Sequence, residues 1–298
     1  MGLVDGRVVV VTGAGRGIGR AHALAFAAEG ARVVVNDGGA SPDGSGGTAG
    51  PAGLVVSEIR ALGGEAVANT DDVADWDGAA RLVSAAVDSF GGLDVLVANA
   101  GFLRDRMLVN LSEEEWDAVV RVHLKGHFAP LRHAAAYWRA EAKAGRARSA
   151  RVVLTSSGAG LLGSVGQGNY SAAKAGILGL ASVAAAELAR YGVLVNAIAP
   201  AARTRMTEGT FDMTAPASGF DAMAPENVSP LVVWLGSVES AGVTGRVFEV
   251  DGGRVSLADG WRHGPSRDKG TRWEPAELGP VVASLLASAP SPEPVYGA

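Results

Sequence analysis

The sequence contains no cysteine among its 298 residues. Disulfides, thiolate zinc sites and a cysteine nucleophile are therefore excluded, and the composition suits a reducing compartment. The first residues carry no basic segment, and the apolar run after them extends only from Val8 to Val11, too short for a signal peptide or a transmembrane helix. Gly6 stands where a myristoylation signal requires serine or threonine. We therefore expect a cytoplasmic protein with no membrane partner.

Charge is also sparse, because only 19% of the residues are charged, the net charge is −5 and the pI is about 5.6. This balance gives no electrostatic basis for binding nucleic acid or an anionic membrane. Apolar residues, in contrast, make up 48% of the chain. A chain of this length and composition can bury a large core, and one α/β domain is the first expectation.

Short β-branched runs alternate with helical stretches rich in alanine and leucine, which predicts a parallel sheet covered on both faces. The expected strands are Arg7–Thr12, Ala31–Asn36, Ala66–Asn69, Leu93–Ala98, Ala150–Thr155 and Val193–Ala199. The expected helices are Gly17–Glu29, Leu54–Leu62, Asp75–Phe90, a helix opened by the capping box Ser112–Glu115, and Tyr170–Arg190. Pro225–Leu235 and Arg246–Val250 complete the alternation, with roughly seven strands in all.

Two segments fall outside this alternation. Gly38–Gly53 is rich in glycine, serine and proline and predicts a long surface loop. We expect one nucleotide-binding domain over residues 1–254 and an extension over 255–298, which carries Trp261, Trp273 and one apolar run at Val281–Leu286. Three interpretations of the extension remain open: it wraps a neighbouring subunit, it closes part of the active site, or it is loosely packed.

A glycine cluster lies between the first expected strand and its helix, in Thr12–Gly19. Glycine permits a tight turn and a close approach of the backbone to a pyrophosphate, whose charge the helix N-terminus favours. The spacing differs from the G-x-G-x-x-G of two-domain dehydrogenases, because Ile18 occupies the last glycine position. We predict that Gly13, Arg16, Gly17, Ile18 and Gly19 bind a dinucleotide, the alternative being a turn alone.

Asp37 lies at the end of the second expected strand. A carboxylate at this place accepts hydrogen bonds from the adenosine ribose and repels a 2′-phosphate, which favours NAD over NADP. The alternative is an ordinary loop aspartate beside Asn36. Arg16 opposes the NAD prediction, because a basic residue in this loop accommodates a 2′-phosphate.

Tyr170 and Lys174 are four residues apart on an expected helix, so both project from one face, separated by about 6 Å along the axis. A phenol titrates near 10, and a neighbouring ammonium favours the phenolate and lowers the pKa. Such a pair is common on helix surfaces, so the spacing alone is weak. Ser157 follows the fifth expected strand, where a small turn exposes a hydroxyl at the carboxyl edge of the sheet; Ser156 is its rival.

Taken together, these motifs resemble those of the short-chain dehydrogenases/reductases over about residues 5–253. The matching stretches are Thr12–Gly19, Asp72-Val73, Asn99-Ala100-Gly101, Ser157, and Tyr170-x3-Lys174 thirteen residues later. The resemblance implies a single-domain Rossmann fold with a doubly wound, parallel, seven-stranded sheet of order 3-2-1-4-5-6-7. It also implies bound NAD(H) or NADP(H). By the same resemblance, Ser157 hydrogen-bonds the substrate oxygen, Tyr170 exchanges its proton, and Lys174 holds the nicotinamide ribose.

The chain departs from the family pattern at two places. His123 stands where many members carry an asparagine that supports a water chain to the lysine, so the proton relay is expected to differ or to become sensitive to pH. His127 lies four residues on, but no carboxylate completes a recognised zinc spacing, and we expect no metal. After the sixth strand the Pro-Gly of the family reads Pro200-Ala201, and the threonine that follows is shifted by one position, to Thr204. The resemblance implies that Pro200 and Ala202 contact the cofactor from this altered loop.

Within the family, the chain is most similar to the 3-hydroxyacyl-CoA dehydrogenase part of peroxisomal multifunctional enzyme type 2. The shared stretches are Val35–Asp37, Leu103–Arg106, Arg121–Gly126, Gly168–Lys174 and Ile198–Pro200. That branch also carries a histidine in the asparagine position and prefers NAD. The resemblance implies interconversion of a secondary alcohol and a ketone, in a 3-hydroxyacyl-CoA or a similar hydrophobic substrate. A steroid, an acyl-carrier-protein thioester, or a regulatory protein that binds NAD without turnover are the alternatives.

Apolar residues between Pro200 and Pro225 predict a flexible lid over such a substrate. They are Met206, Phe211, Met213, Phe220 and Met223. Candidate cations for the phosphates of coenzyme A are Arg104, Arg106, Arg203 and Arg205, although each is also an ordinary surface charge. The helix from Tyr170 is apolar nearly all round, which indicates burial, and the resemblance implies a homodimer or homotetramer built partly through it.

Overall fold

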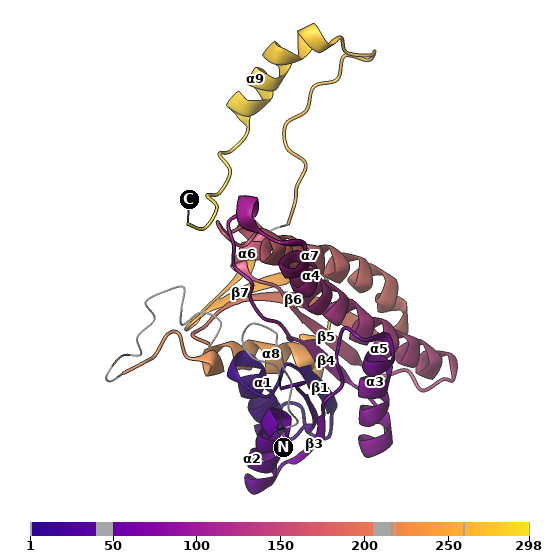
Figure 1. The fold of residues 1–298 in the computed structure, drawn as a ribbon. Coiled ribbons are helices and arrows are strands. Elements are labelled where there is room, and N and C mark those ends of the chain that lie inside the picture. Colours follow the sequence, from indigo (N-terminus) through magenta and orange to yellow (C-terminus); the bar gives the residue numbers. More distant parts are fainter. Residues whose placement is uncertain (1, 40–49, 205–215, 217–218, 259, 298) are drawn as a thin grey trace.

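A computed structural model of the chain describes residues 2–39, 50–204, 216, 219–258 and 260–297, and a twisted sheet runs through the middle of this part (Figure 1). Its strand order is β3-β2-β1-β4-β5-β6-β7-β8. The strands are β1 Val8–Thr12, β2 Arg32–Asn36, β3 Glu65–Asn69, β4 Val95–Ala98, β5 Ala150–Thr155, β6 Val193–Ala201, β7 Val247–Asp251 and β8 Arg254–Ala258. The first seven pair in parallel, which confirms the predicted order.

The eighth strand is the part of the sheet that the sequence did not predict. β8 pairs antiparallel with β7 through a tight turn, so the sheet extends past residue 254, where the extension was expected to begin. Its side chains are half-buried or exposed, as in a strand at the edge of a sheet. Without a buried face the segment has no continuous apolar run, and the sequence pattern therefore gives little sign of it.

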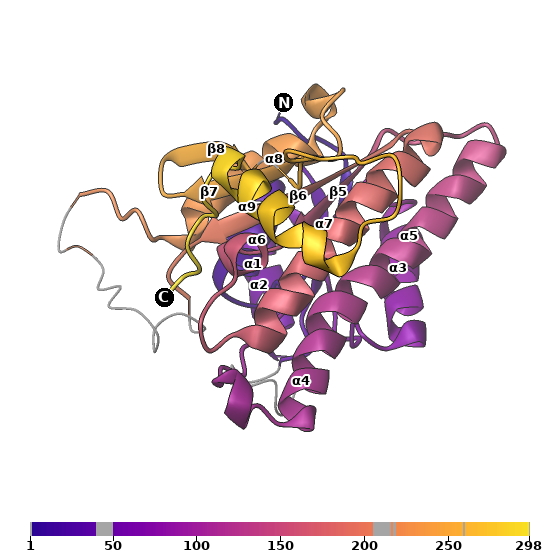
Figure 2. The same cartoon turned by 90° about the horizontal axis from the view of Figure 1, so that it is seen from above.

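Successive side chains of the strands point to opposite faces of the sheet and pack in two separate cores, one on each face. Val9 and Val11 pack toward α1 Gly17–Ala28, α2 Gly50–Ala61 and α8 Ser229–Gly236. Val8 and Val10 pack toward α3 Trp76–Phe90, α5 Gly126–Lys143 and α7 Gly168–Leu188. Figure 2 shows α3, α5 and α7 lying side by side as one layer. Burial on both faces explains why the strand segments are continuously apolar.

The helices follow the prediction with two differences. α2 begins at Gly50, inside the loop expected over Gly38–Gly53, because Pro51 is well suited to a first helical turn; residues 40–49 of that loop lie outside the described residues. The Ser112 capping box is confirmed and opens α4 Glu113–Val120, but a π-helical turn, Arg121–Lys125, separates α4 from α5. This turn carries His123 and was not predicted from the residue pattern.

Short helical segments complete the described part of the chain. They are α6 Gly158–Leu162 and the 3-10 turns Leu108–Asn110, Ala189–Tyr191, Pro225–Val228, Val238–Ser240 and Pro275–Glu277. The expected segment Pro225–Leu235 thus divides into a 3-10 turn and α8. α9 Leu278–Ser288 has no buried residue and lies away from the rest of the fold (Figure 1). We call residues 260–290, which contain α9, the arm.

The segment Gly168–Tyr191, which contains α7, is long and apolar enough to cross a membrane by length and composition, with 39% of its most apolar window buried. Core helices of water-soluble proteins pass the same test, so this is weak evidence for a span. In this structure α7 packs against α6 and β6 and contributes Ile177 and Ala181 to one of the two cores.

Candidate active site

The glycine loop forms a cradle at the start of α1. Gly13 has a φ of +62°, and a Cβ on it would lie 2.7 Å from the Cα of Ala100. A Cβ on Gly19 would lie 2.1 Å from the carbonyl oxygen of Gly13. α1 begins at Gly17, and the side chain of its N-cap residue, Arg16, makes no capping hydrogen bond to the first turn. The cradle therefore fits a pyrophosphate, because these helix N–H groups and the positive end of the helix dipole favour an anion.

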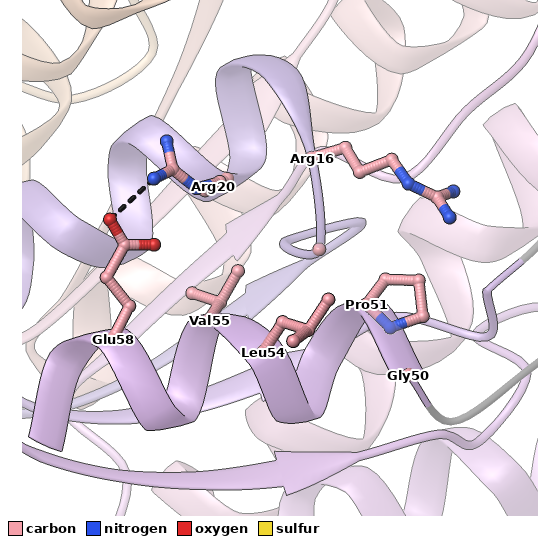
Figure 3. A pocket seen from close by; sticks show the side chains of 8 residues that line it. Arg16, Arg20, Gly50, Pro51, Leu54, Val55 and Glu58 are labelled. Atoms are coloured by element: carbon pink, nitrogen blue, oxygen red, sulfur yellow. Dashed lines mark hydrogen bonds and ion pairs between the residues drawn. The ribbon is translucent and has the colours of Figure 1, made fainter.

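Asp37 is fixed beside this cradle. Its Oδ2 accepts the N–H of Gly15 at 2.9 Å, and its Oδ1 accepts the N–H of Gly39 at 2.7 Å. A carboxylate has further lone pairs, so Asp37 has the capacity to accept additional hydrogen bonds. A hollow of about 420 Å³ opens between the loop and α2 (Figure 3), lined by Gly15, Arg16, Arg20, Gly50, Pro51, Leu54, Val55 and Glu58. The guanidinium of Arg20 is paired with Glu58 across it.

The ends of β1 and β4 are tied together next to the glycine loop. The hydroxyl oxygen of Thr12 accepts the N–H groups of Asn99 and Ala100, at 2.9 and 3.1 Å. The side-chain amide of Asn99 donates to the carbonyl of Thr12 at 3.1 Å. Asn99 and Ala100 thus lie at the carboxyl edge of the sheet, beside Gly13, as a ligand site of a doubly wound sheet requires.

Asp72 and Val73 follow β3 at the same edge. Burial alone would raise the pKa of Asp72, but hydrogen bonds from the Arg121 side chain and the N–H of Ala74 outweigh burial and lower it. The side chain of Val73 is buried and would contact a Cβ placed on Gly126 at 2.9 Å. The carboxylate therefore stays ionised and locks the turn, while Val73 forms part of an apolar wall.

The segment after β6 lies over the glycine loop. Pro200 is in β6, Ala202 is buried, and Cγ2 of Thr204 is 3.4 Å from the Cβ that Gly17 would carry. The N–H of Arg203 donates to the carbonyl of Met223 at 2.7 Å, so the two ends of the expected lid meet. Met206, Phe211, Met213 and Arg205 lie outside the described residues, and the lid prediction is untested there.

Ser157, Tyr170 and Lys174 converge between β5 and α7. The Ser157 side chain lies close enough to the Tyr170 phenol to act on its pKa, and Ser157 also caps α6 by accepting the N–H of Ala159 at 3.2 Å. The Lys174 ammonium lies 5.5 Å from the centre of the Tyr170 ring and donates to the carbonyl of Thr155 at 2.7 Å. The rival serine, Ser156, is buried and donates to the carbonyl of Lys174. The geometry thus brings Ser157, rather than Ser156, to the phenol.

Burial dominates the electrostatics of this group. It raises the pKa of Tyr170 to about 12, although the Ser157 side chain acts in the opposite direction and the Asp105 charge adds to the rise. Burial also lowers the pKa of Lys174 to about 7. The predicted lowering of the tyrosine pKa is therefore wrong for the protein's residues by themselves, because both groups lose hydration and each then favours its neutral form.

His123 lies directly against the tyrosine. Its ring meets the Tyr170 ring edge-on, with centroids 5.1 Å apart, and its Nε2 lies 2.7 Å from the carbonyl oxygen and 3.1 Å from the backbone nitrogen of Phe102. Burial lowers its pKa well below the usual 6.5, so the imidazole stays neutral near pH 7 and the expected pH sensitivity does not arise from this residue. A Cβ on Gly101 would lie 2.2 Å from its Cε1, which explains why that position is glycine.

His127 is buried as well, and burial lowers its pKa to about 3. Within the described part of the chain, no three histidine, aspartate or glutamate side chains gather closely enough to hold a metal ion.

Some site residues were not found from the sequence. The charge of Asp105 raises the Tyr170 pKa, and its Oδ2 accepts the side-chain amide of Gln167 at 2.8 Å. The backbone carbonyl of Thr155 holds Lys174, a contact that no residue pattern reveals. Two of the candidate coenzyme A cations are engaged elsewhere: Arg106 pairs with Glu115, and Arg203 with Asp221.

The family model of short chain dehydrogenases matches residues 7–215. The chain belongs to the short-chain dehydrogenase family. It is an oxidoreductase that acts on CH–OH groups, and its family uses NAD or NADP. This result confirms the resemblance inferred from the motifs.

Individual relatives agree with this assignment. The chain is 46% identical over 298 residues to hydroxyacyl-CoA dehydrogenase ChsB1 of Mycobacterium tuberculosis, covering 95% of this chain and 90% of that protein. It is 47% identical to mouse peroxisomal multifunctional enzyme type 2 over 84% of this chain, but spans only 32% of that protein. A crystal structure of a short chain dehydrogenase from Mycobacterium avium is 68% identical, covers 100% of both chains and superposes with a TM-score of 0.91.

Proposed function

We propose that this oxidoreductase interconverts a 3-hydroxyacyl-CoA and the corresponding 3-oxoacyl-CoA, with NAD(H) as the cofactor. The observation that carries the proposal is the partly buried Tyr170, whose phenol lies close to the Ser157 side chain and whose ring centre lies 5.5 Å from the Lys174 side-chain nitrogen. A tyrosine with a hydroxyl partner and a nearby cation is suited to proton exchange with a secondary alcohol. Similarity to hydroxyacyl-CoA dehydrogenase ChsB1 supports the substrate class.

In the direction of oxidation, the Ser157 hydroxyl hydrogen-bonds the oxygen of the substrate and orients it toward Tyr170. The phenolate of Tyr170 would take the proton of the substrate hydroxyl, and an oxidised nicotinamide, when bound, would supply the acceptor for the hydride that leaves the same carbon. In reduction Tyr170 returns the proton. An ammonium has three N–H groups, one of which donates to Thr155, so Lys174 retains donors for the nicotinamide ribose.

The cofactor assignment rests on Asp37, whose carboxylate is held at the end of β2 by two backbone N–H groups. A fixed negative charge there attracts ribose hydroxyls and repels a 2′-phosphate. Gly13, Gly17, Ile18 and Gly19 would hold the pyrophosphate. Asp72, Val73, Asn99, Ala100, Gly101, Pro200 and Ala202 would line the rest of the cofactor.

The experiment is a substrate panel with the purified chain. We expect oxidation of 3-hydroxyacyl-CoAs with NAD, followed by absorbance of NADH. A clear preference for steroids or for acyl-carrier-protein thioesters would replace the substrate class while keeping the mechanism. If no member of the panel is oxidised, a regulatory protein that binds NAD without turnover becomes the better interpretation.

We also propose that two or four copies assemble through the outer face of α7. The exposed residues of that face are small or apolar, including Ala172, Ala175, Gly179 and Val183. An exposed apolar helix face of this kind is favourable for close contact with a second copy. Light scattering that gives the mass of a single chain at micromolar concentration would contradict this proposal.

A further inference from the structure

The last described residues of the chain return to the loop that follows Ser157. The N–H of Tyr296 donates to the carbonyl of Gly163 at 3.2 Å, and its own carbonyl accepts the N–H of Val165 at 2.9 Å. The two segments pair in parallel at Ser164 and Tyr296. We call residues 291–297 the strap. The strap therefore adds an extended edge to a loop of the candidate active site, although the arm that leads to it stands away from the body (Figure 1).

The other edge of the same loop is also held. The N–H of Arg106 donates to the carbonyl of Gly166 at 2.7 Å, and Arg106 pairs in parallel with Gln167. Gln167 in turn binds Asp105, whose charge acts on Tyr170. The loop between α6 and α7 thus lies between two extended segments, and the strap is one of them.

The side chains of the strap fill spaces that two glycines leave open. A Cβ on Gly158, the residue directly after Ser157, would lie 3.0 Å from both the hydroxyl oxygen and Cε2 of Tyr296. A Cβ on Gly163 would lie 3.5 Å from Cγ1 of Val295. Tyr296 remains 46% exposed, so part of its ring is available to a molecule bound at Ser157.

The strap is stiffened by its own sequence, Ser-Pro-Glu-Pro-Val-Tyr. Pro292 and Pro294 fix φ at alternate positions and keep the preceding residues extended. This lowers the conformational entropy lost when the strap is held in place. No residue of α9 is buried, so the backbone pairing at Tyr296, rather than the helix of the arm, fixes the position of the strap.

We propose that Tyr296 is a specificity-determining residue that packs its ring against the acyl chain of the substrate; this inference rests on the function proposed above. The loop between α6 and α7 also has apolar neighbours on the side away from the strap. There Met107 and Leu108 are exposed close to Gly166 and Gly168. An aromatic ring on one side and aliphatic side chains on the other suit a long hydrocarbon chain better than a short or polar group. A longer acyl chain buries more of the ring, and its binding therefore depends more on Tyr296.

The first test compares 3-hydroxybutyryl-CoA with a long-chain 3-hydroxyacyl-CoA in three full-length variants. Tyr296→Ala should raise KM for the long substrate about tenfold, because it removes an apolar contact of a buried chain, and leave KM for the short one and kcat unchanged. Tyr296→Phe keeps the ring and should behave as the wild type. Leu286→Ala, on exposed α9, is the matched control and should change neither KM. Equal changes of KM for both substrates in Tyr296→Ala, or no change, would overturn the proposal.

A second measurement tests the contact between the strap and the loop, and it does not depend on enzyme turnover. Removing residues 290–298 should speed hydrogen exchange of the Val165 amide, since its acceptor, the carbonyl of Tyr296, is lost. Unchanged exchange at Val165 would show that the strap does not hold the loop and would overturn the proposal. If the wild type oxidises no hydroxyacyl-CoA but Val165 responds as expected, the function proposed above fails and the strap assignment survives, so the two failures are distinguishable.

Discussion

The imidazole of His123 meets the phenol of Tyr170 edge-on, with ring planes at 88° and centroids 5.1 Å apart. The imidazole is itself fixed, because Nε2 lies 2.7 Å from the carbonyl oxygen of Phe102 and Gly101 leaves room for Cε1. We therefore propose that His123 is a positioning residue, which acts on the reaction by holding the tyrosine ring in place. The π-helical turn that carries it is the local distortion that brings it to the tyrosine.

Replacing His123 by asparagine should leave the shape of the pH profile unchanged. Burial holds the pKa of His123 well below 6.5, so the group is neutral on both sides of that pH and contributes no titration. We expect kcat to fall about fivefold because the edge contact is lost, since aromatic pairs contribute about 1 kcal/mol. kcat/KM measured between pH 5 and 10 tests this. A limb near pH 6.5 that is present in the wild type and absent in the variant would contradict the positioning role.

Replacing Tyr170 by phenylalanine should abolish proton exchange while keeping the fold. The variant keeps the ring that packs against His123 and loses only the hydroxyl. General acid–base groups contribute about 100- to 10,000-fold, so kcat should fall by that range while the Kd for NADH stays within about twofold. Tyr191→Phe, at the far end of the same helical segment, is the matched control and should retain full activity. Normal turnover in Tyr170→Phe would refute the mechanism.

The strands and the site motifs were predictable from the sequence because both depend on short stretches of chain. β1, for example, is four consecutive valines ended by Thr12, and only a strand buried on both faces accounts for such a run. The glycine loop, Ser157 and the Tyr170–Lys174 pair follow from spacing at strand ends and on one helix. The sheet order then agrees with the family pattern.

What the sequence did not give depends on contacts between distant segments. The π-helical turn arises where α4 and α5 join, and nothing in Arg121–Lys125 marks it. Tyr296 reaches Gly158 only through the folded arm, and the residue types in the strap carry no sign of that partner. The tyrosine pKa was predicted with the wrong sign because burial, which a sequence does not show, raises it.

Removing the charge of Asp37 should relax the preference for NAD. Asp37→Asn keeps oxygen and nitrogen atoms near Gly15 and Gly39 but no longer repels a 2′-phosphate. We expect the ratio of kcat/KM for NADP to that for NAD to rise about tenfold, equivalent to about 1.4 kcal/mol. Asp88→Asn, exposed on α3, should leave the ratio unchanged. A wild type that already favours NADP would show that the ribose assignment is wrong.

Stability at acid pH should depend on His22, which is buried in α1 with Nδ1 2.9 Å from the Ser229 hydroxyl. Burial lowers its folded pKa to about 3, while the unfolded value is near 6.5. Between these values the unfolded chain binds a proton that the folded chain does not, so the free energy of unfolding falls as the pH drops below 6.5. One such group accounts for about 2 kcal/mol between pH 6.5 and pH 5. Urea unfolding measures the free energy of unfolding at each pH. Between pH 6.5 and pH 5 this free energy should fall by about 2 kcal/mol less in His22→Leu than in the wild type.

His263→Gln is the control, at an exposed position, and its free energy of unfolding should fall as much as that of the wild type. Equal losses in His22→Leu and the wild type would show that His22 is protonated in the folded chain.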